Sequence, residues 1–144
     1  MKRRDLIKVT VATAIGGWAA IGGVLNVNGA ADDALYARCA KACRDCEKAC
    51  RACHKHCAAM VKGGMKEHES SMRLSEDCME VTALCARLCE RKGPMAVALA
   101  EACRKACKAC GSECGKNSDM KPMAECAKAC EACERVCEEL GASQ

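Results

Sequence analysis

Cysteine and charged residues alternate along most of the chain with a period of three to four residues. Cys39, Cys43 and Cys46 are separated by intervals of four and three, and charged residues such as Lys41 and Arg44 lie between them. These intervals place the cysteines on one face of an α-helix and the charged residues on the opposite face. The pattern predicts amphipathic helices whose buried faces consist mainly of cysteine and alanine.

Glycine and proline divide the chain after residue 31 into four helical segments, placed at residues 32–61, 66–92, 95–114 and 120–140. The breaks lie at Gly63-Gly64 and Gly93-Pro94 and in the sequence after Gly115; Pro94 is expected as the first residue of the third helix, and Gly141 is expected to end the fourth. Short connections make sequential helices antiparallel neighbours. The predicted fold is therefore all-α: an antiparallel up-down-up-down four-helix bundle with a Cys-lined core.

The cysteine spacing repeats from one segment to the next. The intervals are 4-3-4-3-4 in the first segment and 4-3-4 in the third and fourth, whereas the second has three cysteines, with Thr82 at a skipped position. This spacing is typical of a helix face that packs against partner helices. The cysteines expected to face inward are Cys39, Cys43, Cys46, Cys50, Cys53, Cys57, Cys78, Cys85, Cys89, Cys103, Cys107, Cys110, Cys114, Cys126, Cys130, Cys133 and Cys137.

The composition leaves little else to fill such a core. The 144 residues include 17 cysteines and no phenylalanine, with Trp18 and Tyr36 as the single tryptophan and tyrosine. A core of alanine, cysteine, methionine and a few leucine and valine residues rarely stabilises a small domain without cross-links or metal. The cysteines are therefore expected to have a chemical role.

Residues 1–31 have the composition of an export signal. Arg3-Arg4 precedes apolar residues and Lys8, which resembles the twin-arginine pattern, and small residues at 29–31 offer a cleavage site. The predicted organisation is a twin-arginine signal over 1–31 followed by a domain over 32–144, with a periplasmic location. The net charge of +4 comes largely from the signal, and the near-neutral remainder argues against nucleic acid as a partner.

A regular sulfur stripe favours metal binding over its alternatives. Disulfides between cysteines one helical turn apart would be strained, although bridges between helices stay open as a scaffold. Thiolates are soft ligands that select Cu(I), Zn(II) or iron–sulfur clusters, and the usual ferredoxin spacing is absent. Eight C-x-x-x-C pairs offer two sulfurs one turn apart, which suits low-coordinate Cu(I) better than tetrahedral Zn(II).

Cys50-Arg51-Ala52-Cys53-His54 also matches the C-x-x-C-H haem motif, but the match lies within an uninterrupted stripe of cysteines and has no aromatic residues around it.

Methionine and histidine gather at one end of the predicted bundle. Among them His54, Met60 and Met123 lie nearest the cysteine stripes on a helical projection. Imidazole and thioether are weaker Cu(I) ligands than thiolate, which suits a metal entrance. We therefore add these three residues to the seventeen cysteines as candidate ligands.

Together, the Arg3-Arg4 signal, the four cysteine-striped helices and the Met/His end resemble the bacterial copper storage proteins, specifically their exported branch. The resemblance implies a homotetramer of bundles that each hold many Cu(I) ions, and a copper-requiring client enzyme. No catalytic triad or carboxylate pair stands out, so the predicted role is storage and not catalysis. A copper chaperone and a zinc-thiolate protein of the metallothionein kind are the alternatives.

Overall fold

The computed structural model describes the backbone of residues 2–144 and the side chains of residues 32–144. The helices are α1 (Lys2–Lys62), the short 3-10 helix η1 (Lys66–His68), α2 (Glu69–Glu90), α3 (Ala96–Gly115) and α4 (Lys121–Ala142), and these described residues contain no strand. The chain separates into two compact units, the first ending at Ala34 and the second spanning Leu35–Gln144. The second unit holds the bundle; the side chains of the predicted signal, residues 1–31, lie outside the described part.

The order of side-chain contacts gives the direction of each helix. Sulfurs of Cys43 and Cys46 on α1 lie 3.8 Å from those of Cys103 and Cys107 on α3, so the residue numbers rise together and these helices are parallel. Cys39 and Cys50, in contrast, approach Cys137 and Cys126 on α4, so α1 and α4 are antiparallel.

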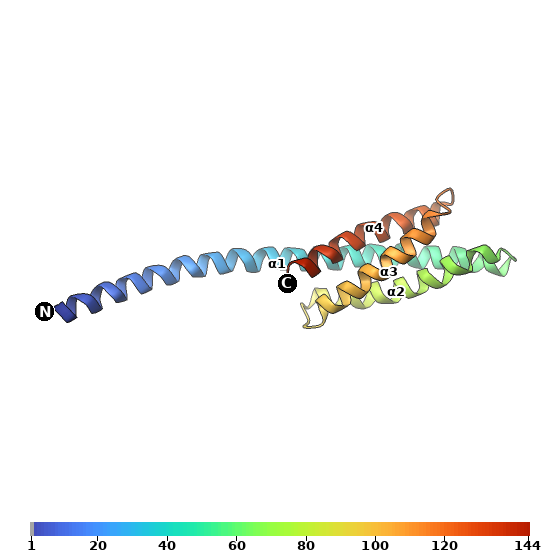
Figure 1. Cartoon of the computed structure of the whole chain (residues 1–144). Coiled ribbons are helices and arrows are strands. Elements are labelled where there is room, and N and C mark those ends of the chain that lie inside the picture. The colour runs from blue at the N-terminus through green and yellow to red at the C-terminus, as the bar shows by residue number, and fades with distance from the viewer. Residues whose placement is uncertain (1) are drawn as a thin grey trace. The chain divides into compact units, whose positions relative to one another are not determined.

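Helix α2 is antiparallel to α1, because Arg44 pairs with Glu90 whereas His54 contacts Met72. The connections α1–α2 and α3–α4 accordingly lie at one end of the bundle and α2–α3 at the other (Figure 1). This is the predicted up-down-up-down four-helix bundle.

Two turns use backbone conformations that most residues avoid. Gly64 has φ 97°, which a glycine adopts without steric penalty. After α2, however, the left-handed residue is Lys92, at φ 49°, and the N–H of Gly93 donates to the Leu88 carbonyl at 2.9 Å. The sequence pointed to Gly93 as the break, whereas the chain reverses one residue earlier.

The structure differs from the sequence prediction at Pro94 and Gly141, neither of which marks the helix end expected of it. Pro94 lies in a turn before α3, because the N–H of Ala96 donates to the Gly93 carbonyl at 2.9 Å and the helix begins only there. Gly141 lies inside α4, which continues to Ala142 and ends with the Ser143 N–H donating to the Glu139 carbonyl. A glycine without positive φ extends a helix as other residues do, at some cost in stability.

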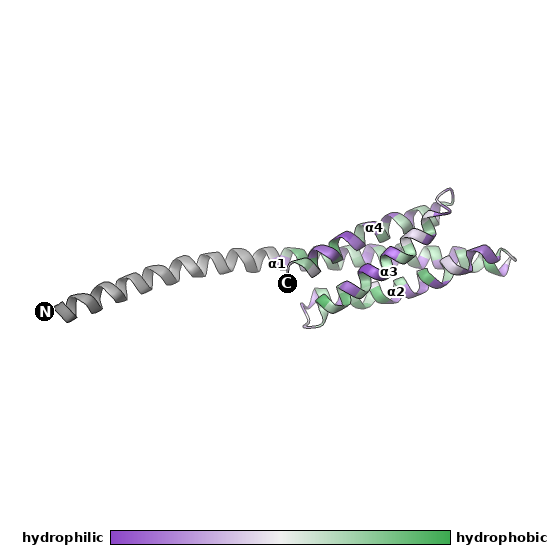
Figure 2. Ribbon diagram, viewed as in Figure 1, coloured by the Kyte–Doolittle hydropathy of each residue, from purple (hydrophilic) through white to green (hydrophobic). Residues whose placement is uncertain are grey.

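Apolar and polar residues alternate along every helix of the bundle (Figure 2). Charged side chains pair on the outside, as in Arg38–Glu139 between α1 and α4 at 3.0 Å and Arg44–Glu90 between α1 and α2 at 2.9 Å. The buried side chains inside are mostly cysteine, with Met123 and Leu140 as the largest apolar ones. The predicted Cys-lined core is confirmed.

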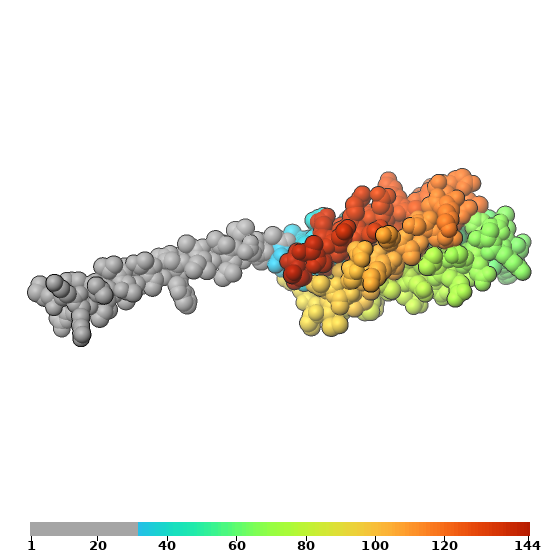
Figure 3. Space-filling model, viewed as in Figure 1, coloured from blue at the N-terminus to red at the C-terminus, as the bar shows by residue number. Residues whose placement is uncertain are grey.

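On one face of the bundle α3 lies between α2 and α4 and contacts both (Figure 3). The close approach of α3 and α4 depends on Gly111, because a Cβ there would lie 3.0 Å from the Cβ of Cys130 and 3.6 Å from the Ala127 carbonyl oxygen. Within the part of the chain that the structure describes, no helix is both long and apolar enough to cross a membrane.

Candidate metal centre

All seventeen cysteines are free thiols with at most 1% of their surface exposed. The 4-3 spacing explains this burial, because each cysteine lies one turn from the next on the face that packs against the other helices. The inward orientation predicted for every cysteine is therefore confirmed. That these thiols bind metal remains a prediction.

The sulfur atoms form a continuous network. Neighbours within one helix, such as Cys46 and Cys50 or Cys133 and Cys137, lie 3.8–3.9 Å apart. Neighbours on different helices are as close, and the shortest approach joins Cys53 to Cys114 at 3.5 Å. Thiol contacts thus run both along the helices and across the core.

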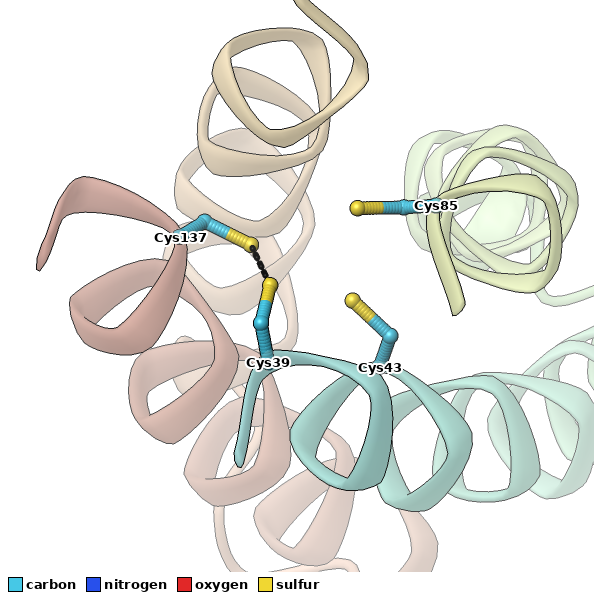
Figure 4. A group of neighbouring side chains, drawn as sticks. All are labelled: Cys39, Cys43, Cys85 and Cys137. Carbon is cyan, nitrogen blue, oxygen red and sulfur yellow. Dashed lines mark hydrogen bonds between the residues drawn. The ribbon is translucent and has the colours of Figure 1, made fainter. Parts of the chain in front are cut away.

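Several sets of sulfurs converge closely enough to share one metal ion. In each of these sets all sulfurs lie within 4.8 Å of one another. Figure 4 shows one of them, in which Cys39 and Cys43 from α1 point toward Cys85 from α2 and Cys137 from α4. The other sets are Cys43, Cys103, Cys133 and Cys137; Cys46, Cys78, Cys107 and Cys130; Cys50, Cys78, Cys110 and Cys130; and Cys53, Cys114 and Cys126.

The spacing of the sulfurs constrains the coordination number. With a metal–sulfur bond of about 2.3 Å, sulfurs are about 4.0 Å apart in a triangle and about 3.8 Å apart in a tetrahedron. A linear pair needs about 4.6 Å by the same bond length. In the C-x-x-x-C pairs whose thiols contact one another, the two sulfurs are 3.8–4.0 Å apart. This distance fits a metal with three or four sulfur ligands, whereas a metal bound linearly by two sulfurs would require them to move slightly apart.

In the metal-free protein the thiols of Cys53 and Cys57 hold their protons. Burial raises the pKa of Cys57 to about 12, because a thiolate there would lose its hydration. Hydrogen bonding with Cys114, together with burial, raises the pKa of Cys53 to about 11. A soft cation that replaces these protons removes the cost of burying thiolates, because it neutralises their charge.

The inner face of α2 is more regular than its cysteines indicate. Ser71, Ser75 and Thr82 are fully buried together with Cys78, Cys85 and Cys89. These six positions have the intervals 4-3-4-3-4, the same as the cysteines of α1. Sequence reasoning assigned Thr82 to this face but missed the two serines, which an extension of the cysteine interval would have found.

The three non-cysteine candidates occupy different environments. Met123 is fully buried at the start of α4, as predicted, whereas Met60 is half-buried near the end of α1. His54 is half-buried, and its Nδ1 donates to the Met72 carbonyl at 3.0 Å. This hydrogen bond leaves the lone pair on Nε2, the arrangement usual for a metal-binding histidine.

His68 is the buried histidine of this end, with 2% of its surface exposed. Its Nδ1 and the Ser71 hydroxyl, one turn further along the same face, are buried without a hydrogen-bond partner. A buried polar group without a partner is costly and calls for an explanation. Sequence reasoning gathered His68 at this end but did not include it among the candidate ligands.

Solved structures of several other proteins resemble this chain. Apo-Csp3, copper storage protein 3 from Bacillus subtilis, is 32% identical with a TM-score of 0.64, and the match covers 72% of this chain and 96% of that one. A cytosolic copper storage protein from Streptomyces lividans with five coppers is 31% identical with a TM-score of 0.71, covering 78% and 97% of the two chains. The Streptomyces protein loaded with 10 copper equivalents is 31% identical with a TM-score of 0.69, covering 76% and 86%. No curated protein matches the chain in sequence.

The predicted periplasmic location is wrong on these comparisons, because the Streptomyces lividans protein that the chain resembles is cytosolic. The prediction depended on the composition of residues 1–31 and not on the bundle. It gave too little weight to the seventeen free thiols, since free thiols persist where cells keep them reduced.

The family comparison covers the bundle itself. The family model described as copper storage protein matches residues 32–142, from the first turns of the bundle to the last turn of α4. This range includes all the cysteines of the buried network and each of the sets of converging sulfurs. On this match, the chain belongs to the copper storage protein family.

Proposed function

We propose that this protein stores Cu(I) at high capacity on the thiolates that line its four-helix bundle. The observation that carries the proposal is the sharing of sulfurs between neighbouring sets. Cys43 and Cys137 belong to two sets, and so do Cys78 and Cys130. Shared sulfurs act as bridges, and bridging thiolates allow metal and sulfur to reach similar numbers.

The proposed ligands are the seventeen buried cysteines, and the capacity is about one Cu(I) per cysteine when every thiolate bridges. Each Cu(I) replaces one thiol proton, so a core with equal numbers of Cu(I) and thiolate carries no net charge. Neutrality is what a buried site without charged side chains requires. Storage, and not catalysis, is the role that such a closed core supports.

Zinc is the second candidate, because four of the sets contain four sulfurs. Their spacing is near that of a tetrahedron with a Zn–S bond of about 2.3 Å. A Zn(II) ion with four separate thiolates, however, leaves a site with two negative charges, and the shared sulfurs prevent neighbouring sets from being filled independently. Both considerations favour Cu(I).

A metal titration separates these functions. Reduced apo-protein is titrated anaerobically with Cu(I) against a chromophoric chelator and, in parallel, with Zn(II). We expect Cu(I) binding to continue to about one ion per thiol. Saturation at one or two Cu(I) would instead indicate a copper chaperone, and tight binding of about four Zn(II) with weak Cu(I) binding would indicate a zinc protein.

We propose that copper enters at the end of the bundle where α1 ends and α4 begins. His54, Met60 and Met123 lie at this end, and so does the unpartnered Nδ1 of His68. The opposite end holds buried Ala96, Ala100 and Leu140, which offer no ligand atom. The opposite end also has Met95, but that side chain is 58% exposed, so the first end provides more soft ligands on the way to the thiols.

Replacing Met60 and Met123 with leucine tests this entrance. Leucine fills a similar volume but has no sulfur, so we expect slower loading and slower removal by a chelator, with almost unchanged capacity. Leu140→Met serves as the matched control at the other end and should leave both rates unchanged. Equal rates in the double variant and the native protein would refute the entrance.

By family resemblance we further propose a homotetramer that supplies a copper-requiring enzyme. A groove between α1 and α4 is the surface to which we assign contact between copies. Its apolar lining comes from Ala42, Ala129, Ala132 and Val136, and its charged lining from Arg38, Lys41, Asp45, Glu125 and Lys128. Light scattering on the purified protein tests the assembly: four chains are expected, and a monomer with full copper capacity would refute it. Ala132→Glu should weaken the assembly if the groove is the contact.

A further inference from the structure

We infer that the thiolate core is divided at Thr82 into two copper clusters that fill separately. The inference rests on the proposed Cu(I) storage and concerns how the stored ions are arranged. The distal cluster comprises the α1 cysteines up to Cys43, the α2 cysteines from Cys85 onward, Cys103, and the α4 cysteines from Cys133 onward. The proximal cluster comprises all other cysteines, which lie toward the proposed entrance.

Thr82 occupies a position on α2 at which the repeat would place a thiol. It follows Cys78 by four residues and precedes Cys85 by three, and its side chain is fully buried. Cys78 converges with sulfurs of the proximal cluster, and Cys85 converges with sulfurs of the distal cluster. Thr82 therefore lies at the level where the two clusters meet.

The hydroxyl of Thr82 is unsuited to replace the missing thiolate. It donates to the Cys78 carbonyl at 2.7 Å and lies 3.1 Å from the Met79 carbonyl. A hydroxyl held against its own helix presents its methyl group to the neighbouring helices. An oxygen donor is also a poor ligand for Cu(I), which prefers sulfur.

Each converging set of sulfurs lies on one side of this division. The two sets that share Cys43 and Cys137 lie wholly in the distal cluster. The two sets that share Cys78 and Cys130, and the set of three at Cys53, lie wholly in the proximal cluster. Among the described thiols, no set combines sulfurs from both sides of Thr82.

Pairwise sulfur distances agree with the sets. Within the clusters many sulfurs on different helices lie within 3.5–3.8 Å, for example Cys43 and Cys133 at 3.7 Å. Across the level of Thr82, only Cys103 and Cys107 approach within 4.0 Å among the thiol contacts of the described residues, at 3.9 Å, and Cys133 interacts more weakly with Cys46 and Cys107. Few two-sulfur contacts therefore join the clusters, whereas the three- and four-sulfur sites lie within them.

Native mass spectrometry during anaerobic Cu(I) titration tests the division. The native protein should show two preferred stoichiometries, one for a single filled cluster and one for both. Cys43→Ser and Cys130→Ser are matched variants, because each removes a buried sulfur that two sets share. The two sets that contain Cys43 lie in the distal cluster, and the two that contain Cys130 lie in the proximal cluster. Each variant should lower the copper number of one step and leave the other step unchanged.

Thr82→Cys should supply the missing thiol and merge the two steps into one, whereas the control Thr82→Ser should keep both. A single continuous loading of the native protein at full capacity would overturn the division while leaving storage intact. Persistence of two unchanged steps in Thr82→Cys, or loss from the same step in both serine variants, would overturn it as well. Saturation of the native protein at one or two ions would refute storage and the division together.

Discussion

Gly111 on α3 faces Cys130 on α4 so closely that a Cβ on Gly111 would lie 3.0 Å from the Cβ of Cys130. The missing side chain lets the two helices approach, and Cys130 is the sulfur that two converging sets share. A glycine inside a helix normally lowers stability by about 1 kcal/mol relative to alanine. Here, close packing offsets that cost.

Gly111→Ala is therefore expected to destabilise the apo-protein. Overpacking costs about 1–3 kcal/mol, and the gain in helix propensity of about 1 kcal/mol offsets only part of it, which leaves a net loss of about 1 kcal/mol. The measurement is urea unfolding under reducing conditions. Gly115→Ala on the same helix is the control, because its added Cβ would meet nothing within 4 Å and should be neutral or stabilising. Equal effects of the two substitutions would contradict the packing argument.

Leu140 closes the end of the bundle opposite the proposed entrance, and it is fully buried. Leu140→Ala should destabilise the apo-protein by about 2–5 kcal/mol, the usual range for a buried leucine. Copper capacity should not change, since no sulfur is lost. Parallel unfolding and Cu(I) titrations check both parts. A loss of capacity in a folded Leu140→Ala protein would show that this end also shapes the metal core.

The cysteine intervals were sufficient to predict the bundle and its lining, because a 4-3 repeat has only one interpretation on a helix. They were not sufficient at positions where other residues continue the repeat. Ser71 and Ser75 extend the buried face of α2, yet serine by itself is usually a surface residue. The cysteine positions alone therefore underestimate the length of the face that α2 buries.

Backbone details were also beyond the sequence. Lys92, and not Gly93, adopts the left-handed conformation after α2, because the hydrogen bond from Gly93 to Leu88 fixes where the chain reverses. The role of Gly111 depends on the distance between α3 and α4, which cannot be predicted from the spacing of residues along one helix. Such features follow from packing between segments and not from local pattern.

Alkaline pH should destabilise the apo-protein more than the loaded protein. The folded state raises the pKa of Cys53 to about 11 and of Cys57 to about 12, against an ordinary value of 9.0. Above pH 9 the unfolded chain therefore binds fewer protons than the folded one, so stability is full below that pH and declines as pH rises toward 11–12. Urea midpoints of the reduced apo-protein between pH 7 and 10 should fall at the upper end. Copper-loaded protein should show no such decline, because its thiols have already lost their protons; a flat apo profile would contradict the raised pKa values.

Proton release distinguishes the two candidate metals without a structure. At pH 7 the thiols of Cys53 and Cys57, with a pKa of about 11 and about 12, are protonated, so each must release its proton before its thiolate binds metal. A core filled with about one Cu(I) per thiol should release about one proton per ion, whereas Zn(II) bridged by thiolates should release two or more. The measurement is a metal titration in weakly buffered solution with a pH indicator. One proton per Cu(I), maintained to the end of the titration, implies that apparent affinity falls about tenfold for each unit of decreasing pH. Release of far less than one proton per Cu(I) would mean that the thiols are ionised in the apo-protein, and a core of buried, unpaired thiolates could not remain folded without other cations.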